Sequence, residues 1–221
     1  MKKYAIILAA GRGERAGIKL PKQFYIINKK PILIHTIEKF LSIKNIIIIL
    51  VLAKDKVSYW KKITKNYLFK NEIIIVKGGK TRFKSVNNAL QIIKEEGIVA
   101  IHDGVRPFVT PKLIEKLFNQ AIKKGNAVPY CKLKDSIRKI SNNNNLSIKR
   151  NNYVLIQTPQ VFNIKEIKEA YNKKEKLTYT DDASVYESQK NTINLVEGED
   201  WNLKITSKND IEAAKYYFIN D

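Results

Sequence analysis

The sequence is poor in the residues that build metal cages and nucleophilic dyads. It has one cysteine, Cys131, and two histidines, His35 and His102, among 221 residues. One cysteine excludes an internal disulfide and is typical of the reducing cytoplasm, where we expect this chain. We interpret both histidines as packing residues, because His35 has apolar neighbours on an expected helix and His102 points to the face of its strand opposite to that of Asp103. We therefore expect no metal site built from side chains and no base–nucleophile pair.

The sequence also lacks a hydrophobic run long enough to cross a membrane. Its longest purely apolar run, 46–53, has eight residues, whereas a helical span needs about 20. The N-terminal "MKKYAIILAAGRG" begins with lysines and an apolar stretch, as a signal peptide does, but it continues into a Gly/Arg loop. A buried first strand is the better interpretation, and we expect no membrane association.

Acidic residues are scarce beside basic ones, at 21 against 41, for a net charge of +20. Such a balance suggests a protein that binds nucleic acid or acidic surfaces, which we keep as the alternative from a different class. That alternative needs a clustered basic face with exposed aromatic residues. The lysines are spread evenly instead, beside 33 Ile and 21 Asn. We attribute them to the codon bias of an AT-rich genome and expect no nucleic-acid partner.

Arginine is rare, since only six of the 41 basic residues are arginine. Lysine can replace arginine as a point charge, but it cannot form a bidentate fork on phosphate or carboxylate. Five arginines lie in the segments that carry the functional motifs below: Arg12, Arg15, Arg82, Arg106 and Arg150.

Strand and helix patterns alternate along most of the chain. This alternation predicts an α/β fold with a doubly wound, mostly parallel sheet and ligands at the carboxyl ends of its strands. A strand pair is expected near 192–205, which would place Lys204 at a strand end. The other expected strands are 4–10, 46–53, 72–76, 98–103 and 126–131, and the helices are those from Pro31 and Pro111, 55–68, 81–96, 164–173, a short one after Thr180 and one from Lys208.

One segment, 133–157, breaks this rhythm. It has two short alternating runs around four asparagines and reads as a β-hairpin. It offers little apolar content to anchor it to the core, so an arm that packs on another subunit and a plain surface hairpin are both compatible with it. Because no linker or second core is evident, we expect 1–221 to form a single domain with 133–157 as its arm.

The loop "LAAGRGERAGIKLPKQF" (8–24) places glycines and bases directly after the first strand. Gly11-x-Gly13-x-x-Ala16 matches the dinucleotide fingerprint, but that site also needs an acid about 20 residues on, and none stands there at a strand end. The Walker pattern does not match either. The loop therefore reads as a phosphate cradle with Arg15 and Lys22 as its charges, or as a plain turn with solvated bases.

Further segments follow in a fixed order: "GGKTRFKSV" (78–86), "HDGVRPF" (102–108), "QTPQVF" (157–162), and "TDDAS" (180–184) with "NLKIT" (202–206). The first loop resembles the signature loop of nucleotidylyltransferases. Together, over essentially the whole chain, the segments resemble the 2-C-methyl-D-erythritol 4-phosphate cytidylyltransferase family. The resemblance implies a Rossmann-like nucleotidyltransferase fold with a protruding β-arm. It also implies an enzyme of the non-mevalonate isoprenoid pathway that joins CTP to methylerythritol phosphate.

The resemblance also implies site residues, Mg²⁺ carried mainly by the CTP phosphates, and a homodimer in which the arm lends Arg150 to the partner's site. The catalytic residues would be Arg15, Lys22 and Lys204. The CTP site would contain Ala9, Ala10, Gly11, Gly13, Gly79, Ser85, Asp103 and Gly104. The methylerythritol phosphate site would contain Asp103, Arg106, Ser136, Arg150, Thr158, Thr180 and Lys204.

Each of these motifs keeps a purely structural alternative. Ser85 can bond its own backbone, Asp103 and Arg106 can form an ion pair in a turn, and Asp181 with Asp182 can cap a helix. For Arg82 we favour a role in ordering its loop.

Some positions depart from the family pattern. Ser136 stands where threonine is usual, Gly104 and Val105 where two alanines are common, and Lys80 where an acid is frequent. The closest functional alternative is ribitol 5-phosphate cytidylyltransferase, but "AAG", "RFKSV" and "TDDAS" favour methylerythritol phosphate.

Overall fold

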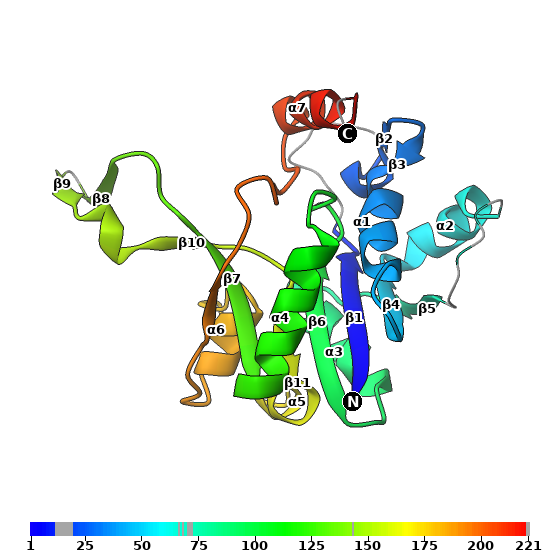
Figure 1. Cartoon of the computed structure of the whole chain (residues 1–221), viewed down its shortest axis with the longest axis horizontal. Coiled ribbons are helices and arrows are strands. Elements are labelled where there is room, and N and C mark those ends of the chain that lie inside the picture. Colours follow the sequence, from blue (N-terminus) through cyan, green and yellow to red (C-terminus); the bar gives the residue numbers. More distant parts are fainter. Residues whose placement is uncertain (12–19, 66, 68, 70–72, 143, 220–221) are drawn as a thin grey trace.

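A computed structural model of the chain describes residues 1–11, 20–65, 67, 69, 73–142 and 144–219 (Figure 1). Its main sheet has eight strands, seven of them in the order β10-β7-β11-β6-β1-β4-β5, and the eighth, β12, pairs with β7. The strands are β1 (Lys2–Ala9), β4 (Ile46–Leu52), β5 (Ile73–Lys77), β6 (Gly97–Asp103), β7 (Asn126–Lys132), β10 (Val154–Ile156), β11 (Gln160–Asn163) and β12 (Leu195–Glu197).

The core of the sheet is parallel, as the alternating pattern predicts. Strand β1 pairs in parallel with β4 and β6, and β5 continues the parallel array beside β4. Strands β10 and β11 run antiparallel to their neighbours, and β11 lies between β6 and β7. The α/β fold with a doubly wound, mostly parallel sheet is therefore confirmed, although the short strand β11 was not predicted.

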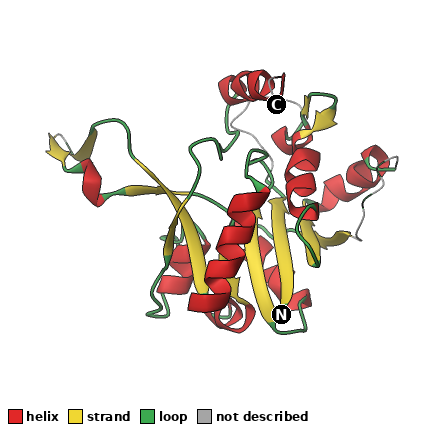
Figure 2. Ribbon diagram, viewed as in Figure 1, coloured by secondary structure: helices red, strands yellow, loops and turns green. Residues whose placement is uncertain are grey.

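Helices cover both faces of the sheet (Figure 2). Alternate residues of β1 point to opposite faces, so that Ala5 and Ile7 join one buried cluster and Tyr4 and Ile6 join the other. The first cluster packs against α1 (Ile32–Leu41), α2 (Val57–Ile63) and α4 (Pro111–Lys124). The second packs against α3 (Arg82–Ile92), α5 (Ile164–Tyr171) and α6 (Asp182–Glu187). None of the helices in the described ranges is both long and apolar enough to span a bilayer.

A third, smaller cluster lies beyond the carboxyl ends of the central strands. There α7 (Lys208–Ile219) packs through Ile211 and Ala214 against Ile27, Val105 and other apolar residues. Ile27 belongs to the small pair of strands β2 (Ile26–Ile27) and β3 (Lys30–Pro31), and two 3-10 turns, Lys22–Phe24 and Lys54–Lys56, follow the first loop and β4.

Only part of the strand pair expected near 192–205 is present. Strand β12 ends at Glu197, and residues 198–206 contain no strand. The expectation that Lys204 ends a strand is therefore wrong. Side-chain hydrogen bonds and isolated backbone hydrogen bonds fix the segment that carries Lys204, in place of the hydrogen bonds of a β-sheet.

The arm is more elaborate than a single hairpin over 133–157. Strands β8 (Ile137–Ser141) and β9 (Asn144–Ile148) pair only with each other. A 3-10 turn, Arg150–Asn152, follows, and β10 then returns to the main sheet beside β7. Figure 1 shows the hairpin standing well away from the sheet. Two of its apolar side chains are mostly exposed, Ile140 at 79% and Leu146 at 61%.

Candidate active site

A cavity of about 1080 Å³ opens where the four neighbouring parallel strands end. Residues after β1, β4 and β5 and at the end of β6 form its walls, which is where ligands bind in open α/β sheets. Its lining consists of Leu8, Ala9, Ala10, Gly11, Lys22, Gln23, Ala53, Lys54, Asp55, Gly78, Gly79, Lys80, Thr81, Arg82, Ser85, Asp103, Val105 and Lys204.

The cavity brings together many of the residues predicted from the sequence. Those that line it are Ala9, Ala10, Gly11, Lys22, Gly79, Ser85, Asp103 and Lys204. Other predicted residues do not line the cavity. Arg106 and Thr158 contact Asp103, and Gly104 bonds to Leu8 on the neighbouring strand. Thr180 is exposed before α6, and Ser136 and Arg150 are exposed on the arm. Gly13 and Arg15 lie outside the described residues.

The side chain of Gln23 holds the end of the first loop that the structure describes. Its amide nitrogen donates to the carbonyl oxygens of Ala9 at 2.7 Å and Gly11 at 3.0 Å, and the residue is almost fully buried. This residue was not predicted from the sequence. A polar side chain in "PKQF", next to the predicted phosphate lysine Lys22, is the only local signal for it.

The second wall of the cavity is the turn between β5 and α3. The Ser85 hydroxyl donates to the Thr81 carbonyl at 2.9 Å and accepts from the Gly79 N–H at 3.0 Å. The structural alternative for Ser85 is thus present, because its hydroxyl bonds the backbone of its own loop. A side chain at position 78 would place its Cβ only 2.4 Å from the Cβ of Ala10, so glycine allows the two loops to approach each other closely.

Asp103, at the end of β6, is surrounded by three cations. Its carboxylate lies 2.8 Å from Lys204 Nζ, 3.5 Å from Arg106 Nε and 4.0 Å from Arg82 Nε. Burial alone would raise the pKa of this carboxyl, but the attraction of Lys204, Arg82 and Arg106 outweighs it and holds the pKa well below its usual range. Asp103 is therefore ionised throughout the neutral range.

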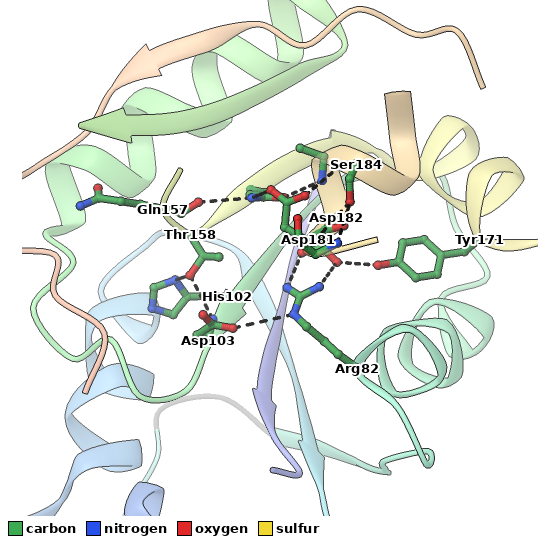
Figure 3. A network of polar contacts seen from close by, with 12 residues as sticks. Arg82, His102, Asp103, Gln157, Thr158, Tyr171, Asp181, Asp182 and Ser184 are labelled. Carbon is green, nitrogen blue, oxygen red and sulfur yellow. Dashed lines mark hydrogen bonds and ion pairs between the residues drawn. The ribbon is translucent and has the colours of Figure 1, made fainter. Parts of the chain in front are cut away.

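His102 and Thr158 fix the turn that carries Asp103 (Figure 3). The Asp103 N–H donates to Thr158 Oγ1 at 3.1 Å, and that hydroxyl lies 3.1 Å from Nδ1 of His102. His102 Nε2 lies 3.1 Å from the Arg106 carbonyl. Because a carbonyl can only accept, Nε2 carries the proton and Nδ1 accepts from Thr158. Burial lowers the pKa of His102 to about 4, so the ring is neutral and structural, as predicted.

The segment that carries Lys204 is tied to the same turn. Arg106 Nη1 donates to the Asn202 carbonyl at 2.7 Å, and the Asn202 amide donates to the Thr158 carbonyl at 2.7 Å. The Ile205 N–H donates to Val105 at 2.9 Å. Asn202 is fully buried and was not singled out in the sequence analysis. These bonds replace the predicted strand as the reason why Lys204 reaches Asp103.

The two acids of "TDDAS" have different roles. Asp181 is the N-cap of α6 and accepts from the Ser184 N–H at 2.9 Å, so the capping interpretation is confirmed for it. Asp182 lies in the first turn, as expected of an acid there, but its carboxylate accepts from Arg82 at 2.8 and 2.5 Å and from the Tyr171 hydroxyl at 2.6 Å. Arg82 therefore joins the start of α3 to α6 through a buried partner that was not predicted, and it also lines the cavity.

The described part of the chain holds no group of three or more His, Cys, Asp or Glu side chains able to cage a metal ion. Asp103 supplies one carboxylate at the cavity, and Asp55 is on its wall. Since Mg²⁺ typically uses one or two carboxylates together with substrate phosphates, these residues fit an ion that arrives with a nucleotide.

Comparisons with known proteins agree with this geometry. Residues 4–220 match a family model described as 2-C-methyl-D-erythritol 4-phosphate cytidylyltransferase. The protein of that name from Phocaeicola vulgatus is 39% identical over 97% of this chain and 99% of its own length. The one from Azobacteroides pseudotrichonymphae is 42% identical over 97% of both chains. The crystal structure of 4-diphosphocytidyl-2C-methyl-D-erythritol synthase from Anaerococcus prevotii is 31% identical with a TM-score of 0.85, covering 99% of this chain and 98% of the other. The chain belongs to the 2-C-methyl-D-erythritol 4-phosphate cytidylyltransferase family.

Proposed function

We propose that the cavity is the site at which this nucleotidyltransferase joins CTP to 2-C-methyl-D-erythritol 4-phosphate, releasing pyrophosphate. The observation that carries the proposal is the buried carboxylate of Asp103 with Lys204, Arg106 and Arg82 around it. It lies in one cavity with two glycine-containing loops. The volume of about 1080 Å³ lies at the upper end of the roughly 300–1,000 Å³ range of ligand pockets, large enough for a nucleotide.

In this proposal the nucleotide occupies the side of the cavity between the loops after β1 and β5. Ala9, Ala10, Gly79 and Ser85 line that side of the cavity, and their small side chains would frame the cytosine, as the family resemblance implies. The ribose would lie toward Asp103. Gly104 supports that position from behind, since its N–H donates to the Leu8 carbonyl at 2.9 Å and locks β6 to β1.

Methylerythritol phosphate would occupy the side that carries Lys204. The Lys204 ammonium is half-exposed, whereas Arg82 and Arg106 are held by further partners, Asp182 and the Asn202 carbonyl. Lys204 is therefore the cation best able to leave Asp103 for an incoming phosphate. Thr180 would contact the same phosphate, and Thr158 would act through its bond to the Asp103 N–H.

The chemistry needs charge control rather than a base. The second pKa of a phosphate monoester is about 6, so the attacking oxygen is already anionic near neutral pH. Its attack on the α-phosphorus of CTP forms one P–O bond and breaks another, and pyrophosphate leaves with the electron pair. The barrier comes from bringing several negative charges together. Lys22 and Arg15 would hold the triphosphate, and Lys204 would hold the nucleophile.

Mg²⁺ would accompany CTP, bound by its phosphates with Asp103 as a protein carboxylate. When bound, it neutralises charge on the phosphates and orients them.

Three further features belong to the same proposal. The chain would act in the cytoplasm, which suits its single cysteine, and would bind neither nucleic acid nor membrane. It would form a two-fold homodimer in which the arm reaches the partner's site. The support for the dimer is the exposed apolar surface of the arm and the position of Ser136 and Arg150 on the arm rather than at the cavity of their own subunit.

The direct test is pyrophosphate release with Mg²⁺ and CTP, with either methylerythritol phosphate or ribitol 5-phosphate as the acceptor. We expect the higher kcat/KM with methylerythritol phosphate. A higher value with ribitol 5-phosphate would assign the other substrate, and release of pyrophosphate with neither would overturn the proposed reaction.

A further inference from the structure

Arg82 is one of only six arginines in a chain with 41 basic residues. Its two terminal nitrogens donate to the two oxygens of Asp182 at 2.8 and 2.5 Å, a fork-to-fork pairing that joins residues 100 positions apart (Figure 3). Lysine cannot make this pairing, because an ammonium offers a point charge rather than a planar pair of donors. In this lysine-rich chain, the arginine is explained by a need for the fork.

Asp182 has no access to solvent, and its second partner is the Tyr171 hydroxyl. Its neighbour Asp181 caps α6 and also accepts from the Gln160 amide at 2.8 Å. The start of α6, which follows Thr180, is thus anchored to the sheet through β11 and to α3 through Arg82. The Arg82 side chain is the direct polar connection from this anchor to the cavity.

The other end of the guanidinium faces the catalytic cluster. Arg82 lines the cavity, and its Nε lies 4.0 Å from Asp103 Oδ1, on the side of the carboxylate opposite to the oxygen that Lys204 and Arg106 approach. One planar group therefore contacts two carboxylates, Asp182 with its ends and Asp103 with its Nε. This geometry places a charge beside Oδ1 and leaves Oδ2 to Arg106 and the exchangeable Lys204.

We propose that Arg82 is a positioning residue and that the Arg82–Asp182 pair is a brace. The brace fixes the turn after β5, on the nucleotide side, to the start of α6, on the acceptor side, and it orients Asp103 between them. The inference rests on the assignment of the two substrate sides given above. It adds a role for two residues whose charges face each other rather than the substrates.

Asp182 also restrains Arg82. If that carboxylate is neutralised, the two terminal nitrogens lose their charged acceptor, and Asp103 is the nearest remaining carboxylate. Arg82 would then compete with Lys204 for Asp103 and would no longer define the turn after β5. A displacement of about 1 Å between reacting groups can lower turnover by up to about 100-fold.

The test separates positioning from stability by a double-mutant cycle. Arg82→Gln leaves the fully buried Asp182 carboxylate without its charged partner, and Asp182→Asn removes the forked acceptor of a guanidinium that is one-third exposed. Both variants should lower the melting temperature, Arg82→Gln more strongly, because an unpaired buried charge is strongly destabilising. The double variant removes both charges and should regain part of the melting temperature that the single variants lose. We expect its kcat, measured at saturating CTP and methylerythritol phosphate, to remain at least about 10-fold below that of the wild type.

Arg82→Lys is the second variant, because it keeps the charge and loses only the fork. We expect its kcat to resemble that of the double variant. Tyr186→Phe is the matched control. It removes a buried hydroxyl from a carboxylate, Glu166, and it lies on the same helix α6 but away from the cavity. It should lower the melting temperature and leave kcat within about twofold of the wild type.

The outcomes are distinct. A double variant that recovers kcat together with its melting temperature would make the pair merely structural and would overturn the proposal, as would an Arg82→Lys enzyme with wild-type kcat. Both comparisons are made against wild-type protein that releases pyrophosphate in the same assay. A wild type without that activity would instead refute the proposed reaction, so the two failures cannot be confused.

Discussion

The cavity and the arm are built by opposite means, although the family resemblance implies that both contribute residues to the methylerythritol phosphate site. At the cavity, the carboxylate of Asp103 is buried and held by three cations, two of which, Arg82 and Arg106, are tied to Asp182 and Asn202 in turn. On the arm, Ser136 and Arg150 are exposed, and β8 and β9 pair only with each other. The cavity is preorganised within one chain, whereas the β8–β9 hairpin of the arm pairs with no other strand in the described part of its own subunit.

The difference indicates which charges of the site are preorganised within one chain and which become so only in a dimer. Preorganised charges act on the transition state because they need no rearrangement when charge develops. An exposed arginine on a long arm gains that property only when a second surface covers it. If the arm completes a partner's site, both substrate sides become preorganised in the dimer, and the monomer is an incomplete enzyme. The predictions below test this division.

The largest expected effects are on turnover. Lys22→Ala, which changes the cavity, should lower kcat by about 100-fold or more, because Lys22 is proposed to neutralise charge on the triphosphate. Arg15→Ala should do the same. Arg150→Ala, which changes the arm, should lower kcat/KM for methylerythritol phosphate by a comparable factor while the KM for CTP changes little.

Arg138→Ala is the matched control on the arm. Arg138 is exposed on β8, and its guanidinium bonds to Asn145 within the same hairpin. It should retain near-wild-type kinetics, measured by pyrophosphate release. Wild-type kinetics for Arg150→Ala as well would remove the arm from the site, and wild-type turnover for Lys22→Ala at saturating CTP would end the role proposed for that lysine.

The next effect is a gain of activity on mixing subunits. Equal amounts of Lys22→Ala and Arg150→Ala chains, exchanged to equilibrium, form mixed dimers as half of all dimers. In a mixed dimer one site collects both lesions and the other collects neither, if each arm serves the partner. About a quarter of wild-type activity should then return.

If Arg150 serves its own subunit, every site in the mixture carries one lesion, and the activity stays at the level of the parents. Subunit exchange must be demonstrated independently, for instance with differently tagged chains that co-purify. A flat result with proven exchange would contradict a shared site.

The cavity and the arm also differ in how much of each could be predicted from the sequence. The strands and helices of the core follow from their apolar periodicity, and the end of β6 correctly places Asp103 at the carboxyl edge of the sheet. Arg106, three residues further on, could be paired with Asp103 from its spacing, but Arg82 and Lys204 could not, because their contacts with Asp103 span long separations. Asp182 and Asn202 illustrate the limit, since neither carries a local signal of the Arg82 or Arg106 bonds that fix it.

Short elements that lack a strong apolar periodicity also could not be predicted from the sequence. Strand β11 has four residues and a fixed place only because β6 and β7 flank it. The Lys204 segment resembles a strand in its alternation but lies where no strand pairs with it, so tertiary hydrogen bonds decide its course. For the arm, the sequence gives a hairpin but not its partner surface.

A smaller effect should appear in the pH dependence of stability, and it should come from the cavity rather than the hairpin 137–148, which contains no histidine. Burial lowers the pKa of His102 from 6.5 to about 4. The unfolded chain therefore binds the proton first, so stability is complete above about pH 6.5 and is lost as the pH falls toward 4. Between pH 7 and pH 5 the free energy of unfolding should fall by about 2 kcal/mol from this group.

The comparison for His102 is the same urea titration of His102→Gln at both pH values. His35, whose pKa burial also lowers, is present in both proteins and cancels. The variant should lose less stability between pH 7 and pH 5, by about 2 kcal/mol. Equal losses in the two proteins would mean that burial does not hold His102 neutral.

The smallest effect is expected from Ile140→Ala on the arm. Ile140 is 79% exposed in the single chain, whereas Ile101 in β6 is fully buried. At protein concentrations low enough to dissociate a dimer, Ile140→Ala should change the free energy of unfolding by no more than about 0.5 kcal/mol, against about 2–5 kcal/mol for Ile101→Ala. A partner that covers the arm stabilises only the folded chain, so the effect of Ile140→Ala should grow as the protein concentration rises, while that of Ile101→Ala should not. Denaturation at two concentrations a hundredfold apart measures this difference. If the Ile140→Ala effect is the same at both, no second subunit rests on this part of the arm, and the arm's role in a partner's site would have to be carried by its other face.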